Sequence, residues 1–310
     1  MSLHTILGAG GSISNYLVPI LLENKEQVRL VSRSQKNIAG TGNIIADLTN
    51  AEQTKKAVEG SSVVYLLVGL EYKIKVWKEQ WPAIMTNVIN ACSEANAKLI
   101  FFDNVYMYGK VHGAMTEETA FNACSRKGEV RVAIANQLLH AMKTKKVNAL
   151  IARSADFYGP GSDKTGMVNI TVFQNLAKNK TAQCLVDANK PHSFTYVPDA
   201  AKALYLLAKD DTAFNQTWHL PTRSNPLTGK EFIELAAKEF DRPPKFMVFP
   251  KWMIKLSGLF MPIMKEMYEM LYQNELAYVF DSTKFEKHFH FAPTSYEDGI
   301  KTTAQYYLKK

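Results

Sequence analysis

The sequence has few cysteines and no long apolar run. Cys92, Cys124 and Cys184 are odd in number and widely spaced, which argues against both a disulfide framework and a metal site. The longest apolar segment, residues 63–70, is far shorter than the roughly 20 residues that a membrane span needs. The N-terminus has no charged region followed by a long apolar core. We therefore expect no signal peptide and a cytoplasmic location.

Positive charge is plentiful but not clustered. The 310 residues carry a formal net charge of +8, yet the lysines are scattered and form no basic stripe between aromatic residues. We therefore expect no nucleic-acid partner. The hydrophobic fraction of 46% and the charged fraction of 21% are ordinary for a globular protein. The length suits one large core with a smaller lobe.

The first 20 residues change from a strand to a helix through glycines. An apolar run at residues 3–7 enters the spacing Gly8-x-x-Gly11-x-x-Ser14, and a helical pattern follows. Such a turn places unpaired N–H groups and the positive end of a helix dipole at the glycines, where a pyrophosphate can approach the backbone. A serine stands where a third glycine would complete the pattern.

A second strand, residues 27–32, ends about 20 residues beyond the glycines, where a dinucleotide fold contacts the adenosine ribose. An acidic residue there would select NAD, but the chain has Arg33, with Lys36 nearby. An arginine fork suits a 2′-phosphate, so the sequence favours NADP(H) over NAD(H). The alternative is a solvent-exposed arginine in a loop.

Strands alternate with helices through the first half of the chain. We predict further strands at residues 43–48, 62–69 and 98–104, with helices at 51–59 and 72–96, the latter kinked or broken at Pro82. This alternation predicts an α/β fold with a doubly wound parallel sheet of the Rossmann type. We assign residues 1–160 to a dinucleotide-binding domain, with later returns around 191–208. Residues 161–310 form a smaller, mostly helical substrate lobe.

Four segments in order carry a family resemblance. They are the Gly8 turn, the Asp103-to-Gly109 strand end, the Ile151-to-Gly161 strand and loop with its Tyr-Gly-Pro-Gly, and the segment His192–Ala201. Together they resemble the extended short-chain dehydrogenase/reductases of the NAD-dependent epimerase/dehydratase group. The resemblance implies dinucleotide binding and an oxidoreductase or isomerase activity on a small carbonyl or hydroxyl substrate. The cofactor positions expected from it are Gly8, Gly10, Gly11, Ser12, Ile13, Arg33, Asp47, Leu48, Val68, Gly69, Asn104, Arg131, Ala155 and Phe157.

The chain departs from this family at its catalytic residues. The family's Ser or Thr falls at Asn104, and its Tyr-x-x-x-Lys falls at Lys127 and Arg131 on the next helix. No tyrosine lies between Val111 and Phe157, so no shift of the alignment restores the motif. We keep all three residues as candidates.

The remaining candidates lie outside that helix. Tyr106, Tyr108 and Tyr158 are candidate substitute acids, and Tyr158 and His192 are candidate substrate contacts. The family usually has an arginine at the position of His192, where it grips a substrate diphosphate, so the histidine weighs against a nucleotide sugar. A literal Tyr-x-x-x-Lys at Tyr106–Lys110 follows a strand exit, and we interpret it as coincidence.

Residues 246–272 are rich in methionine and aromatic side chains, with lysines beside them. Three interpretations remain open: a substrate lobe or lid with an apolar pocket, a homodimer face, and an interfacial membrane helix. We favour the first and expect no membrane partner. Two other functions also stay open, a non-catalytic NADP(H)-sensing protein and a membrane-surface enzyme for lipid-like substrates.

Overall fold

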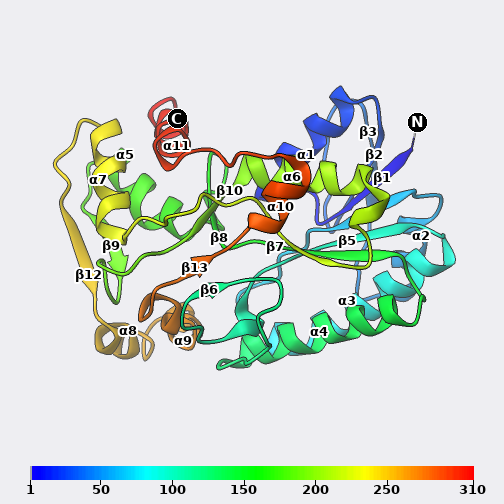
Figure 1. Ribbon diagram of the computed structural model, residues 1–310, viewed down its shortest axis with the longest axis horizontal. Coiled ribbons are helices and arrows are strands. Elements are labelled where there is room, and N and C mark those ends of the chain that lie inside the picture. The colour runs from blue at the N-terminus through cyan, green and yellow to red at the C-terminus, as the bar shows by residue number, and fades with distance from the viewer. Residues whose placement is uncertain (1) are drawn as a thin grey trace. The chain divides into compact units, whose positions relative to one another are not determined.

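The computed structural model describes residues 2–310, and the chain forms two compact units (Figure 1). Unit 1 comprises residues 1–107, 126–153 and 201–218, and unit 2 comprises residues 108–125, 154–200 and 219–310. The chain therefore passes between the units several times.

A seven-stranded sheet forms the centre of unit 1. Its strand order is β11-β7-β5-β4-β1-β2-β3, and every neighbouring pair from β7 to β3 is parallel. The order reverses direction at β1, as in a doubly wound dinucleotide-binding sheet. The strands are β1 (Leu3–Leu7), β2 (Gln27–Ser32), β3 (Thr41–Ile45), β4 (Val63–Leu66), β5 (Lys98–Asp103), β7 (Ala149–Arg153) and β11 (Thr217–His219).

Helices pack on both faces of this sheet, which confirms the predicted fold class. Figure 1 shows α3 and α4 side by side along one face, and their apolar stripes join β4 and β5 in one core. Among residues 2–310, no helix is both long and apolar enough to cross a membrane. The helices are α1 (Ser12–Glu23), α2 (Ala51–Val58), α3 (Ile74–Glu94), α4 (Arg126–Lys143) and α6 (Val197–Lys209), and the last begins in unit 2.

Two predicted strand boundaries were wrong, and the break allowed for at Pro82 does not occur. β4 ends at Leu66 because its partner β1 ends at Leu7, where the glycine turn begins. β3 begins two residues and ends three residues earlier than expected, since it pairs with β2 only as far as Ser32. α3 continues through Pro82 without a break. Pro82 lies on the exposed face, where water can satisfy the carbonyl that loses its intrahelical donor.

Unit 2 contains short parallel strand pairs and helices around an aromatic core. β8 pairs with β10, β9 with β12, and β6 with β13, and α11 packs on α7. A capping box starts α7, in which the Thr228 hydroxyl accepts a hydrogen bond from the Glu231 N–H and the Glu231 carboxylate accepts one from the Thr228 N–H. The elements are β6 (Ala114–Met115), β8 (Asp156–Tyr158), α5 (Gln174–Ala177), β9 (Ala182–Leu185), β10 (Phe194–Tyr196), α7 (Gly229–Glu239), β12 (Phe246–Phe249), α8 (Lys251–Ser257), α9 (Pro262–Tyr268), β13 (Val279–Phe280), α10 (Thr283–Phe289) and α11 (Tyr296–Leu308).

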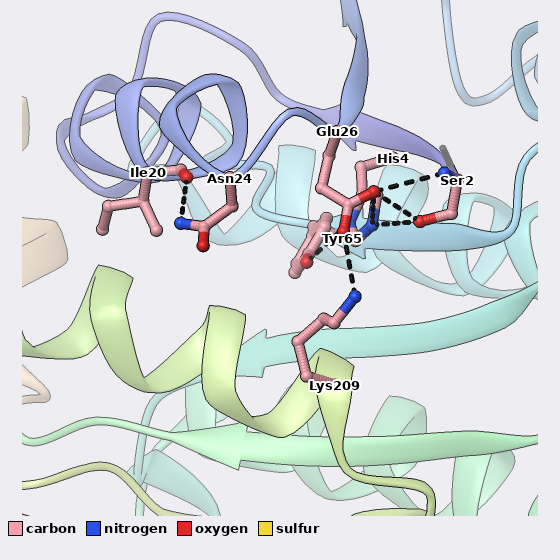
Figure 2. Close-up of polar contacts among 7 residues, drawn as sticks. All are labelled: Ser2, His4, Ile20, Asn24, Glu26, Tyr65 and Lys209. Carbon is pink, nitrogen blue, oxygen red and sulfur yellow. Dashed lines mark hydrogen bonds and ion pairs between the residues drawn. The ribbon is translucent and has the colours of Figure 1, made fainter.

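A buried polar cluster ties the first strand of unit 1 to its surroundings. Figure 2 shows His4 between two hydroxyls, with Nδ1 3.0 Å from Tyr65 and Nε2 2.9 Å from Ser2. The Ser2 hydroxyl donates to Glu26, which also accepts a hydrogen bond from Lys209 at 2.9 Å. Burial lowers the pKa of His4 from 6.5 to about 4, so its imidazole is neutral at pH 7.

This cluster predicts a pH-dependent stability. The unfolded chain binds a proton at His4 near pH 6.5, whereas the folded chain does so near pH 4. The free energy of unfolding should therefore fall as the pH drops from 6.5 to 4, by up to ~3 kcal/mol from this residue. Burial raises the pKa of Glu26, but hydrogen bonds from Lys209 and Ser2 outweigh it and lower the pKa from 4.5 to about 2. The contribution of Glu26 to the free energy of unfolding is therefore lost as the pH falls below 4.5.

Urea unfolding at a series of pH values measures this slope. His4→Gln should flatten the profile between pH 6.5 and 4, while His112→Gln, at an exposed histidine, should leave it unchanged. An equal slope in the two variants would contradict the assignment.

Candidate functional site

The glycine turn between β1 and α1 has a backbone that other residues would strain. Gly8 and Gly10 have φ of +100° and +92°. A Cβ on Gly8 would lie 2.8 Å from the backbone of Leu67 and Val68 in the strand-end segment after β4. Ser14, at the position of the missing third glycine, accepts a hydrogen bond from the Gly10 N–H and donates one to the Gly11 carbonyl, both at 2.9 Å. The serine therefore braces the turn from inside.

The turn fits a phosphate group. α1 begins with Gly11 as its N-cap, and no side chain caps the helix. Ser12 and Ile13 form its first turn, at the positive end of the dipole. The Lys36 side chain lies beside Gly10, where its Cε would be 2.9 Å from a Cβ. Glycine at position 10 thus leaves room for the Lys36 side chain, which brings a positive charge to the turn, as the site of an anionic cofactor requires.

The ends of β2 and β3 carry the residues expected at the adenosine side. Arg33 is exposed immediately after β2, and Asp47 is exposed two residues after β3. Hydrogen bonds from Thr49 lower the pKa of Asp47, and the nearby Arg33 charge lowers it further. Leu48 is buried. After β4, Val68 is half-buried, and a Cβ on Gly69 would meet no atom within 4 Å, so this end of the sheet has room for a ligand.

Asn104 follows β5 directly and has a local structural role. Its side-chain oxygen accepts a hydrogen bond from the Tyr106 N–H at 3.0 Å, which starts the short 3₁₀ helix η1 (Tyr106–Tyr108). Its NH₂ group is therefore the part of the amide that can donate to a ligand. Because η1 ends at Tyr108 and Gly109 has a φ of +66°, residues 106 and 110 do not share a helical face.

The two α4 candidates lie one turn apart and are both buried. Lys127 is 0% exposed, and its Nζ lies 4.6 Å from the ring centre of Tyr72. Arg131 donates to Asp103 at 3.1 Å, and its guanidinium lies over the rings of Trp77 and Trp81 at 4.7 and 4.2 Å. Burial raises the pKa of Asp103, although the positive charges of Arg131 and Arg153 oppose this.

Tyr72 was missed by the sequence analysis. It belongs to the segment between β4 and α3, it is half-buried, and its ring packs edge-on against Trp77 at 5.7 Å. Trp77 in turn stacks on Tyr106 at 6.2 Å. Tyr72 and Tyr106 therefore lie beside Lys127 and Arg131 at the carboxyl ends of β4 and β5. The strand-end position of Tyr72 was a signal, but no motif marked it.

Two of the three predicted substitute acids, Tyr108 and Tyr158, are deeply buried in unit 2, whereas Tyr106 is half-buried. Tyr108 is 1% exposed, and its hydroxyl lies 2.8 Å from His219 Nε2. Tyr158 is also 1% exposed, and its hydroxyl would lie 2.2 Å from a Cβ on Gly299 of α11. Burial raises the pKa of Tyr158 well above its ordinary value. Both tyrosines therefore have the surroundings of core residues.

His192 is held by protein groups. Its Nε2 lies 3.0 Å from a carboxylate oxygen of Asp156, and its ring stacks on Tyr278 at 4.3 Å. The Ala155 N–H donates to Thr195, and Phe157 is half-buried in β8.

The comparison with known proteins gives one family. The model of the NAD dependent epimerase/dehydratase family matches residues 4–218. No curated protein matches the sequence.

Solved structures share the fold. UDP-glucose 4-epimerase of Thermus thermophilus, in complex with NAD, has 17% identity and a TM-score of 0.81, with 98% of each chain covered. UDP-glucose 4-epimerase of Thermotoga maritima, with UDP-glucose, has 16% identity and a TM-score of 0.82, with 99% of each chain covered. dTDP-glucose 4,6-dehydratase of Bacillus anthracis str. Ames, with NAD, has 14% identity and a TM-score of 0.83, covering 100% of this chain and 97% of that one. At these identities the likeness establishes the fold.

The glycine turn predicts a matched pair of variants. Gly8→Ala should lower the free energy of unfolding by on the order of 2 kcal/mol or more, because alanine is strained at this φ and its Cβ meets backbone atoms. Gly11→Ala should cost far less, since its Cβ would meet only the Gly8 carbonyl at 3.7 Å. Urea unfolding measures both, and equal losses would contradict the geometry described for the turn.

Proposed function

The chain belongs to the NAD dependent epimerase/dehydratase family, and from this premise we propose that it is a nicotinamide-dinucleotide-dependent oxidoreductase or isomerase. Its substrate is a small carbonyl or hydroxyl compound. The observation that carries the proposal is the position of Lys127, buried beside Tyr72 and one helical turn from Arg131. Lys127 lies in the same unit as the glycine turn. By the sequence resemblance, it falls where the family has its tyrosine.

The residues that would hold the cofactor lie at the carboxyl edge of the sheet. Gly8–Ile13 would hold the pyrophosphate, Asp47 and Leu48 would border the adenine, and Val68 and Gly69 would border the nicotinamide ribose. Arg33 is exposed at the end of β2, where it can contact a 2′-phosphate, so we propose NADP(H) as the preferred form. The solved structures cited above that hold a dinucleotide hold NAD. The dinucleotide supplies or accepts the hydride.

Lys127 takes over the proton transfer that a tyrosine performs in the family. The Asn104 NH₂ group donates to the substrate oxygen and orients it. The Lys127 ammonium gives its proton to that oxygen as the carbonyl is reduced, and the amine takes it back in the reverse direction. Tyr72 and Tyr106 wall the site, while Arg131 holds α4 in place through Asp103.

The substrate differs from a nucleotide sugar in its anchoring. By the sequence resemblance, His192 falls where the family usually has an arginine that grips the substrate diphosphate. Its partner is Asp156, at 3.0 Å. A carboxylate so close repels a diphosphate. This observation supports a substrate without a nucleoside diphosphate.

A second function, a non-catalytic NADP(H) sensor, has one observation in its favour. α4 holds no tyrosine, and the hydroxyls of Tyr108 and Tyr158 lie among core residues. Such a protein would bind the dinucleotide tightly and change its affinity for a protein partner with the redox state.

Turnover of NADPH against a panel of carbonyl compounds and nucleotide sugars tests the enzyme proposal. Lys127→Met should lower kcat by about 100-fold or more, since a general acid contributes at least this much. Lys143→Met, at an exposed lysine on the same helix, should retain full activity. Lys127→Arg keeps the charge but should stay inactive, which separates proton transfer from folding. Tight NADPH binding without turnover on any substrate would favour the sensor instead.

Binding of the two cofactors tests the role of Arg33. Arg33→Ala should weaken NADPH binding by about 10- to 100-fold, the loss expected for a charged hydrogen-bonded pair, with little effect on NADH. Lys36→Ala should weaken both cofactors alike, because Lys36 lies beside the pyrophosphate turn. Lys56→Ala, at an exposed lysine on α2, removes the same charge and should change neither. Equal losses in Arg33→Ala for the two cofactors would contradict the NADP(H) assignment.

A further inference from the structure

More than half of the exposed large apolar side chains in residues 2–310 gather on one short segment of unit 2. Eleven large apolar residues of this described range are exposed, and six of these form what we name the α8–α9 apolar cap. Phe260 is 83% exposed, Leu259 75% and Trp252 65%. The cap consists of Trp252, Leu256, Leu259, Phe260, Met261 and Ile263. A contiguous group of this kind marks an interaction site.

The cap is not a core face of its unit. Ile254 is the one buried side chain of α8, and α9 has none. The two helices instead pack on each other at Gly258, where a Cβ would lie 3.2 Å from both the Lys255 carbonyl and the Lys265 N–H. This close junction folds the segment back on itself and leaves the apolar residues of the connection, 259–261, pointing away from the core. A substrate lobe packed on itself does not account for that exposure.

Positive charge frames the cap. Residues 251–268, which include both helices, contain three lysines and one acidic residue, Glu266. Lys255 and Lys265 are exposed, whereas Lys251 forms an ion pair with Glu275 and lies 5.5 Å from the ring centre of Tyr268. Apolar and aromatic side chains surrounded by lysines suit binding to a surface that has an apolar interior and anionic groups at its boundary with water.

We propose that the α8–α9 apolar cap inserts into the interfacial region of an anionic lipid surface. Its Trp and Phe side chains enter the boundary between headgroups and acyl chains, and Lys255 and Lys265 contact the headgroups. A second copy of the chain is a poorer occupant, because a symmetric contact would bring the lysines of the two caps together. The helices are seven residues each, so the segment lies on the surface rather than spanning it.

The chain has a built-in reporter for this proposal. Of its four tryptophans, Trp77, Trp81 and Trp218 are at most 4% exposed, whereas Trp252 is 65% exposed. A change in tryptophan emission on adding vesicles therefore reports mainly on the cap.

The experiment titrates the full chain with vesicles of phosphatidylglycerol and phosphatidylcholine. We expect a blue shift of the emission, quenching by lipids brominated on their acyl chains, and co-sedimentation that falls with added salt. Leu259→Ser with Phe260→Ser should lower the vesicle affinity at least tenfold. Lys255→Glu with Lys265→Glu should abolish the preference for anionic over zwitterionic vesicles. Ile45→Ser, at an apolar residue that is 61% exposed elsewhere, should bind like the parent.

Other occupants give different results. If the cap joins two copies, light scattering will show a dimer that the Leu259→Ser, Phe260→Ser variant dissociates, and Trp252 emission will not respond to vesicles. If a substrate lid explains the exposure, NADPH with substrate will shift the emission and vesicles will not. Either result would overturn the proposal. Because none of these readouts requires turnover, the outcome is independent of the proposed catalytic function.

Discussion

A buried ion pair between Asp103 and Arg131 fixes the geometry of the candidate site. It joins the end of β5 to α4 at 3.1 Å, and the rings of Trp77 and Trp81 from α3 cover the guanidinium. Breaking such a pair on one side leaves a buried charge without compensation, which is costly. The pair thereby sets the height of α4 against the sheet and places Lys127, one turn earlier, beside Tyr72. The position of Lys127 therefore depends on Arg131, which holds α4 through its ion pair with Asp103.

The sequence predicted those parts of the fold that local pattern determines. Glycines between an apolar strand and a helical pattern identified the cofactor turn, and apolar runs identified the sheet and its order of strands and helices. Strand ends were less predictable, because the end of β4 is set by β1, a partner about 60 residues away in the chain. The effect of Pro82 was also not predictable from local pattern, because the free-energy cost of a proline inside a helix depends on whether it lies on a buried or an exposed face.

The candidate site was predictable as a location but not in its chemistry. Lys127 and Arg131 were found by spacing, and α4 brings them onto one face. The burial of Tyr108 and Tyr158 could not be read from their strand-end positions, because it arises from contacts with His219 and Gly299, more than 100 residues away. Tyr72 was not predicted as a site residue, because only tertiary packing brings it to Lys127.

In the mechanism proposed above, a dinucleotide lies at the carboxyl edge of β4 and β5, with Lys127 and not a tyrosine next to the reacting centre. A crystal structure of the chain with NADPH tests this most directly. We predict that the pyrophosphate lies on Gly8–Ile13 and that Lys127 Nζ lies closer to nicotinamide C4 than any tyrosine hydroxyl. A tyrosine hydroxyl in that position, or a nicotinamide bound away from Asn104 and Lys127, would contradict the account.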